Sequence, residues 1–222
     1  EPSQDDATLT EQIESLRDMP HIRVSALSVE PLSLGAAVLG QEARLKIAGG
    51  MEASGADSLQ GRLQVVRLDG VPGEITVDAR YGVENKTLAL DVTAAEPEGG
   101  LLARALDVPG HPALAAALKG DGPISGWKGH FDMSFGAAVS AQADLTVRHA
   151  DETEFQVEGS ARLPSGDATV VEKILSGEHR FQVSGTYGKG DVLTLSAVRL
   201  EAALATLEMH GKLGLDDLSL DA

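Results

Sequence analysis

An alternation of apolar and polar residues with a period of two is the feature that most constrains the fold of this 222-residue chain. Within residues 74–81, Ile75 and Val77 would point to one side of a strand, and Thr76 and Asp78 to the other. Strands of this kind bury one face and leave the other in water. Nine further segments repeat the pattern. With Ile75 and Val77, they give one apolar set: Leu45, Ile47, Leu63, Val65, Leu88, Leu90, Val92, Phe131, Met133, Phe135, Leu145, Val147, Phe155, Val157, Phe181, Val183, Leu193, Leu195, Leu207 and Met209.

The alternation predicts an antiparallel sheet, because strands of a parallel sheet covered on both faces would be apolar almost throughout. Short segments rich in turn-forming residues separate the strands, such as Asp69-Gly70 and Pro72-Gly73. We therefore expect a mainly β protein, with about ten to thirteen strands joined as a meander of hairpins.

A few segments with helical spacing interrupt the strands. The first would begin with a capping box at Thr8 and end before Pro20. Residues 101–106 and 114–118 predict two more short helices, and residues 167–176 a fourth. Helices this short and apolar need a surface to pack on, and the apolar face of the sheet is the natural one.

These interruptions suggest an organisation in three parts. Residues 1–95 would form a first β-groove module with an N-terminal helix, and residues 96–122 a short helical insert. Residues 123–222 would form a second β-groove module that includes the helix near 167–176.

Glycines inside the predicted strands suggest how the sheet departs from a flat shape. Gly159, Gly185 and Gly211 each lie within an alternating segment rather than in a turn. Interior strand glycines usually mark bulges, bends or a close approach to the backbone, and their repetition would let the sheet curl. Trp127, the single tryptophan, precedes a strand, and we expect it to pack under the preceding helix rather than to act as an interfacial anchor.

Several functional classes find no support in the residues. The chain has no cysteine, its six histidines occur singly, and no nucleophile motif is present, so we predict no metal, no cofactor and no enzymatic activity. A net charge of −16 would repel nucleic acid. No stretch approaches the 18 or so apolar residues that a membrane-spanning helix needs.

One stretch carries a family resemblance. Residues 96–136 contain Gly-Gly-Leu-Leu-Ala-Arg, then Leu-x-x-Pro-Gly-x-Pro-Ala-Leu, then Gly-x-Gly-Pro-Ile-x-x-Trp-x-Gly. In order and spacing these pieces resemble a segment of the large TamB proteins of bacterial envelopes. The resemblance implies a long sheet folded into an open groove with an apolar interior. It also implies an inner-membrane anchor, a path through the periplasm, and an outer-membrane β-barrel partner similar to TamA, with this chain as an interior segment.

The leading functional hypothesis combines the alternation of the strands with the resemblance to TamB proteins. A sheet with one uncovered apolar face would expose more apolar surface than a soluble monomer tolerates, unless it curls around itself or around a ligand. We therefore expect an open groove whose interior, lined by the apolar set above, holds phospholipid acyl chains on their way between the inner and outer membranes of a Gram-negative bacterium.

Two alternatives stay open at this stage. The open sheet edges would allow strand addition to unfolded outer-membrane proteins, or pairing of two copies of the chain. A closed sandwich or barrel would instead act as a ligand-free spacer. The low aromatic content, 3% of residues, argues against a closed core of that size.

Overall fold

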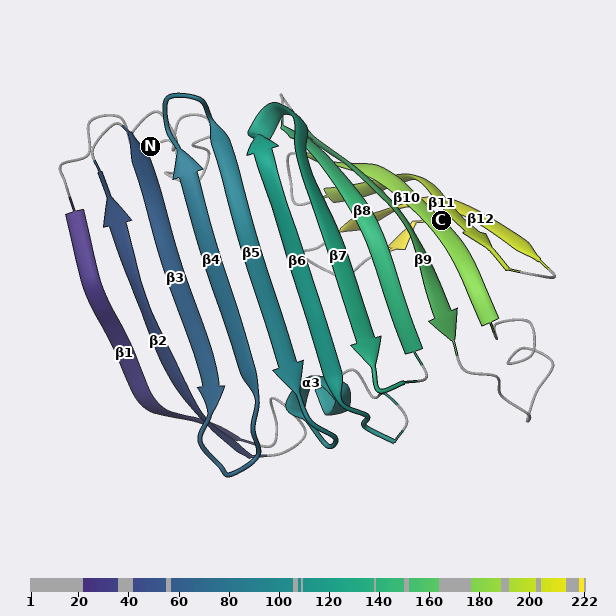
Figure 1. Ribbon diagram of the computed structural model, residues 1–222. Coiled ribbons are helices and arrows are strands. Elements are labelled where there is room, and N and C mark those ends of the chain that lie inside the picture. The colour runs from purple at the N-terminus through teal and green to yellow at the C-terminus, as the bar shows by residue number, and fades with distance from the viewer. Residues whose placement is uncertain are drawn as a thin grey trace.

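The computed structural model describes residues 22–35, 42–54, 57–105, 108, 110–137, 139–149, 152–163, 177–188, 192–202, 205–214 and 220–221. Within these residues, thirteen strands form a single sheet in which neighbours in space are neighbours in sequence (Figure 1). The strands are β1 (Ile22–Leu34), β2 (Ala43–Ala53), β3 (Ser58–Arg67), β4 (Glu74–Gly82), β5 (Thr87–Glu96), β6 (Leu114–Pro123), β7 (Trp127–Phe135), β8 (Val139–His149), β9 (Thr153–Leu163), β10 (Gly177–Gly188), β11 (Val192–Glu201), β12 (Thr206–Gly214) and the two-residue β13 (Leu220–Asp221).

The predicted fold class is confirmed, because every described strand pair is antiparallel and the sheet is an open meander. Within the described residues β1 pairs only with β2, so the sheet does not close into a barrel. Figure 1 shows the sheet twisting along its length, so that β10–β12 run in a different direction from β1–β5. None of the helices in the described part of the chain is long and apolar enough to cross a membrane.

The strand register places apolar residues opposite one another on the same face of the sheet, which we call the apolar face. Residues directly opposite in an antiparallel pair share a face, and the side-chain period is two. One row can be followed from β1 to β12: Leu27, Gly49, Leu63, Val77, Val92, Leu118, Phe131, Ala143, Gly159, Phe181, Leu200 and Leu207. The parallel rows on either side of it are also mostly apolar. The opposite face, which we call the polar face, carries most of the charged residues of the strands.

Register shifts keep the rows aligned where the sequence changes phase. In β11, Leu195 and Val198 would point to opposite faces of a regular strand, but the register shift between them returns Val198 to the apolar face, opposite Met209. Two similar shifts occur in β1, one between Val24 and Leu27 and one before Leu32. The irregularities therefore preserve the apolar face instead of interrupting it.

The two long margins of the sheet differ. Along one, which we call the hairpin margin, only a few residues separate β2 from β3, β4 from β5, β6 from β7 and β8 from β9 in the sequence. Along the other, which we call the helix margin, the connection between β5 and β6 contains helix α3 (Leu101–Ala105). The amide of Leu102 donates a hydrogen bond of 2.7 Å to Glu96 Oε2, which satisfies one of the free N–H groups at the start of α3.

Helix α3 packs on the end of the apolar face nearest the helix margin. Ala103, which is fully buried, contacts Leu114 and Phe135, each 6% exposed, and Met133 and Val139 pack around them. All the buried side chains in the described strands lie on the apolar face: Ala43, Ala53, Arg67, Leu114, Trp127, Phe135, Ala143 and His179.

The helix predicted over residues 114–118 is wrong, because these residues open strand β6, which pairs with β5 and β7. The run from Ala115 to Ala117 favours a helix by intrinsic propensity, but two flanking strands supply a complete backbone ladder and override it. The predicted insert 96–122 thus holds one short helix and then a strand, while the division at 95 and 123 stays a prediction. The helices predicted from Thr8 and over 167–176 lie outside the described residues.

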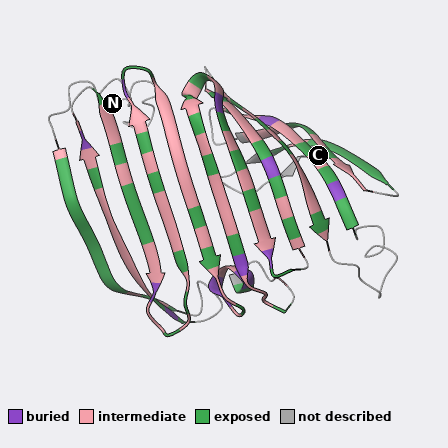
Figure 2. Ribbon diagram, in the orientation of Figure 1, coloured by how far each residue is buried: buried purple, intermediate pink, exposed green. Residues whose placement is uncertain are grey.

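Strand β1 forms a sheet edge with features that hinder further pairing. Its residues from Arg23 to Pro31 are all exposed, and Figure 2 shows most of this strand in the colour of exposed residues. Two register shifts and Pro31 lie within it. Bulges and proline both disfavour addition of another strand, so this edge is poorly suited to strand pairing.

The packing of α3 leads to a stability prediction. Phe135→Ala should lower the free energy of unfolding by about 3 kcal/mol, because the ring is enclosed between the sheet and α3 and its loss leaves a cavity. Phe131→Ala, in the same strand but on the uncovered part of the face, should cost about 1.5 kcal/mol. Urea unfolding followed by circular dichroism measures both. Equal losses would contradict the enclosure of Phe135 by α3.

Candidate ligand-binding face

The apolar face contains all the residues that the sequence analysis assigned to the interior of a groove. By register, Leu45 and Phe135 lie nearest the helix margin, and Leu88, Val147 and Leu195 nearer the hairpin margin. The rows between them hold the following residues: Ile47, Leu63, Val65, Ile75, Val77, Leu90, Val92, Phe131, Met133, Leu145, Val157, Phe181, Val183, Leu207 and Met209. Phe155 lies in the row of Val147, and Leu193 in the row beyond it. All the predicted groove-lining residues therefore lie on one continuous surface.

Sequence reasoning missed other members of this face. Val24, Leu27 and Val29 of β1 belong to it, but the register shifts break their alternation in the sequence. Leu118 was hidden in the predicted helix. His179, which is 2% exposed, lies in the row of Ala161, and its sequence context gave no signal of burial.

Aromatic side chains lie directly on glycines of neighbouring strands. A Cβ atom at Gly159 would come within 2.7 Å of the Phe181 ring opposite it, and one at Gly185 within 2.7 Å of the Phe155 ring. These glycines give the rings room to lie against the sheet instead of standing upright, an arrangement that also shields the glycine backbone. Of the roles expected for interior strand glycines, namely bulges, bends or close approach, close approach is the one found at these two.

Trp127 occupies the largest such space. Its indole Nε1 donates a 3.0 Å hydrogen bond to the carbonyl oxygen of Leu88 on β5, so the ring reaches from β7 across β6. A Cβ at Gly120 or at Gly129 would collide with the indole ring. Trp127 is 7% exposed and thus packs as expected, but it packs on the sheet and not under a helix. The Gly-x-Gly-Pro-Ile-x-x-Trp-x-Gly spacing is explained by this contact.

Much of the apolar face is uncovered. All the exposed large hydrophobic side chains of the described residues lie on it: Val24, Leu27, Val29, Met51, Leu63, Tyr187, Leu207 and Met209. Leu27, Leu207 and Met209 are each at least 50% exposed. The face therefore has the chemistry and extent of a surface that something else covers.

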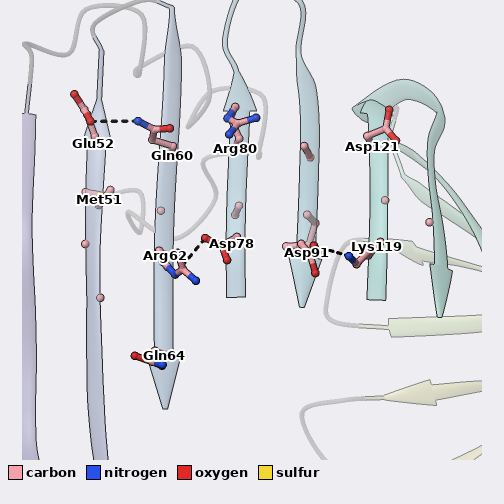
Figure 3. A pocket seen from close by; sticks show the side chains of 18 of the residues that line it. Met51, Glu52, Gln60, Arg62, Gln64, Asp78, Arg80, Asp91, Lys119 and Asp121 are labelled. Carbon is pink, nitrogen blue, oxygen red and sulfur yellow. Dashed lines mark hydrogen bonds and ion pairs between the residues drawn. The ribbon is translucent and has the colours of Figure 1, made fainter. Parts of the chain in front are cut away.

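Ion pairs cross the strands of the polar face. Arg62 Nε lies 3.5 Å from Asp78 Oδ1, and Lys119 Nζ lies 3.0 Å from Asp91 Oδ2. These pairs and Glu52 with Gln60 are seen in Figure 3. Their side chains are largely solvated, so each pair contributes little to stability.

A hollow of about 1160 Å³ lies among these polar side chains, over β1–β8 (Figure 3). Its walls carry both signs of charge, including Arg80, Lys119, Asp91 and Asp121. An acyl chain placed there would leave these groups desolvated, at a cost that no apolar contact offsets. We therefore take the apolar face, and not this hollow, as the candidate site for an apolar ligand.

On the polar face, His130 lies between two carboxylates. Its Nδ1 lies 2.7 Å from Asp144 Oδ1, and its Nε2 lies 3.3 Å from Asp132 Oδ2. The hydrogen bond with Asp144, assisted by the charge of Asp132, raises the pKa of His130 above its ordinary value of 6.5. The described residues contain no group of three or more metal-ligating side chains.

Two other pKa shifts mark the margins of the apolar face. At the helix margin, Arg67 donates hydrogen bonds of 3.0 and 2.8 Å to both carboxylate oxygens of Asp69, and these lower the pKa of Asp69. At the hairpin margin, burial raises the pKa of Tyr81. The Tyr81 hydroxyl is enclosed and has no hydrogen-bond partner in the structure.

Comparison of the chain with protein-family models, with curated proteins and with solved structures found no match.

The contact of Trp127 with glycine gives a spectroscopic prediction. Gly129→Ala should push the indole off the sheet, because the new methyl group would lie about 2.5 Å from the ring. The fluorescence of this single tryptophan should shift to the red, and the chain should become less stable. Gly126→Ala is the matched control, since nothing lies within 4 Å of a Cβ there. An unchanged emission spectrum in Gly129→Ala would contradict the packing.

The histidine on the polar face gives a pH prediction. Because the folded pKa of His130 lies above the unfolded value of about 6.5, its stabilising effect is complete below that pH and is lost as pH rises through the folded pKa. Asp144→Asn should lower the folded pKa, which NMR titration of the ring measures directly. A titration curve unchanged by Asp144→Asn would show that the hydrogen bond does not set the pKa.

Proposed function

We propose that this chain is a segment of a periplasmic bridge that carries phospholipid between two membranes, with the acyl chains held against the apolar face. The observation that carries the proposal is the apolar row that runs unbroken from Leu27 in β1 to Leu207 in β12, on a sheet that leaves much of this face exposed. A surface that is continuous from strand to strand offers a lipid the same environment at each step along the sheet.

The energetics favour apolar contact without a specific binding motif. Each methylene group moved from water to this face contributes about 0.8 kcal/mol, so an acyl chain gains affinity from length alone. The Phe155, Phe181 and Trp127 rings add apolar area to this face, where they lie close against glycines. Low selectivity among lipids is the expected consequence.

The polar face suits a segment surrounded by water. Its charges occur as cross-strand pairs such as Arg62 with Asp78, and the chain as a whole carries −16. A high net charge of one sign keeps such chains soluble and apart. The face therefore opposes aggregation of a sheet whose other face is apolar.

The structure bears on the alternatives. A closed sandwich or barrel is wrong for the described residues, because they form one open sheet. Strand addition at β1 is hindered by its two register shifts and Pro31. Lipid carriage uses the feature that dominates the molecule, namely the uncovered apolar face.

The cellular setting is part of the proposal and rests on the resemblance of residues 96–136 to TamB proteins. By that resemblance, this segment belongs to a protein anchored in the inner membrane of a Gram-negative bacterium. Its outer-membrane end would meet a β-barrel partner similar to TamA. The chain itself would contact only lipid in the groove.

A charge placed in the middle of the apolar face tests the proposal. Val92→Glu should abolish or strongly reduce phospholipid co-purification, because the carboxylate would have to be desolvated beneath an acyl chain. Thr93→Glu is the matched control: it adds the same charge to the same strand on the polar face, and should retain lipid. Native mass spectrometry of chains purified from bacterial envelopes measures bound lipid.

Circular dichroism of both variants establishes that they fold. A wild-type chain free of lipid would count against the proposal, and so would a folded Val92→Glu chain that carries as much lipid as Thr93→Glu. In either case the apolar face would have to be covered by protein instead.

A further inference from the structure

The two margins of the apolar face differ in chemistry as well as in shape. Tyr81 and Trp127 lie in one row near the hairpin margin, and Tyr187 lies one row further out. These are both tyrosines and the single tryptophan of the chain. The remaining aromatic residues are phenylalanines, which carry no polar group.

Tyrosine and tryptophan combine an apolar ring with a polar tip, and they concentrate where hydrocarbon meets water. In membrane proteins the same two residues gather at the level of the lipid headgroups. Along the hairpin margin, Tyr187 is 39% exposed, whereas the Tyr81 hydroxyl is enclosed and has no protein hydrogen-bond partner in the structure. This margin therefore matches the boundary between the tails and the headgroup of an amphiphile.

The helix margin has the opposite character. At β6–β8, helix α3 covers it, and Ala103, Leu114 and Phe135 are all buried there. Two charged side chains nearby make protein contacts: Arg67 binds Asp69 through Nε and Nη2, with its Nη1 enclosed, and Glu96 accepts the hydrogen bond from the start of α3. A headgroup placed beneath α3 would therefore lie among buried apolar side chains.

The width of the face fits the length of one acyl chain. Tyr81 and Ile75 lie six residues apart on β4, a run of about 20 Å at roughly 3.3 Å per residue. One lipid tail occupies about 15 Å, half of the hydrocarbon core of a bilayer. A tail aligned with the strands thus reaches from the hairpin margin almost to α3.

We infer that a phospholipid lies on this sheet with its acyl chains parallel to the strands, its headgroup at the hairpin margin beside Tyr81, Trp127 and Tyr187, and its methyl ends toward α3. This inference rests on the proposed function and adds to it the orientation of the bound lipid. The headgroup would travel along the line of hairpin turns, in contact with water, while the tails stay on the apolar face.

Trp127 is a native reporter for this orientation. The chain is mixed with phosphatidylcholine that carries a nitroxide quencher either near the headgroup end of an acyl chain or near its methyl end. The label near the headgroup should cause the greater loss of Trp127 fluorescence, because the indole lies at the hairpin margin.

Moving the reporter provides the internal control. In a Trp127→Phe chain that also carries Met133→Trp, the tryptophan lies near α3, and the label at the methyl end should now cause the greater loss. Val139→Trp gives a second reporter on the same margin and guards against a misfolded Met133→Trp chain.

The negative outcomes distinguish the proposed lipid binding from the inferred orientation of the lipid. Folded chains that neither label quenches bind no lipid, and this result would overturn the proposed function together with the orientation. Quenching that is equal for the two labels, or that has the same order at both reporter positions, would overturn the orientation alone.

Discussion

Cross-strand register is the constraint on which the rest of this structure depends. A slip of one residue between any two strands would turn the apolar residues of one toward the polar side of its neighbour. The sheet avoids this over twelve strands, and in β1 and β11 it does so by bulging wherever the sequence changes phase. The apolar face is therefore a property of the whole sheet, since no single strand contributes more than a few residues to it.

Glycine opposite an aromatic ring is the second device that shapes the face. Phe181 lies over Gly159, Phe155 lies over Gly185, and Trp127 lies over two glycines. Rings on a flat sheet would otherwise stand up and divide the surface into separate compartments. With these rings close to glycines and α3 covering the helix margin only at β6–β8, the face stays open across the strands and toward the hairpin margin.

The polar face has to be compatible with water. A one-layer sheet exposes both of its surfaces, so the side opposite the apolar residues must be fully compatible with water. Cross-strand pairs such as Lys119 with Asp91 provide this and add little stability, because they are solvated. Stability must come from the backbone ladders and from whatever covers the apolar face. An apolar ligand on that face would therefore stabilise this fold.

The sequence by itself determined the strands, their antiparallel order and the apolar set, because side-chain direction in a strand follows locally from a period of two. It did not reveal β1, whose bulges break the period, or β6, whose alanines favour a helix in isolation. Only the tertiary structure decided that one open layer forms, that Trp127 lies on the sheet, and that His179 is buried. These outcomes depend on which strands become neighbours and what lies across from each residue, and such distant contacts leave no periodic trace in the chain.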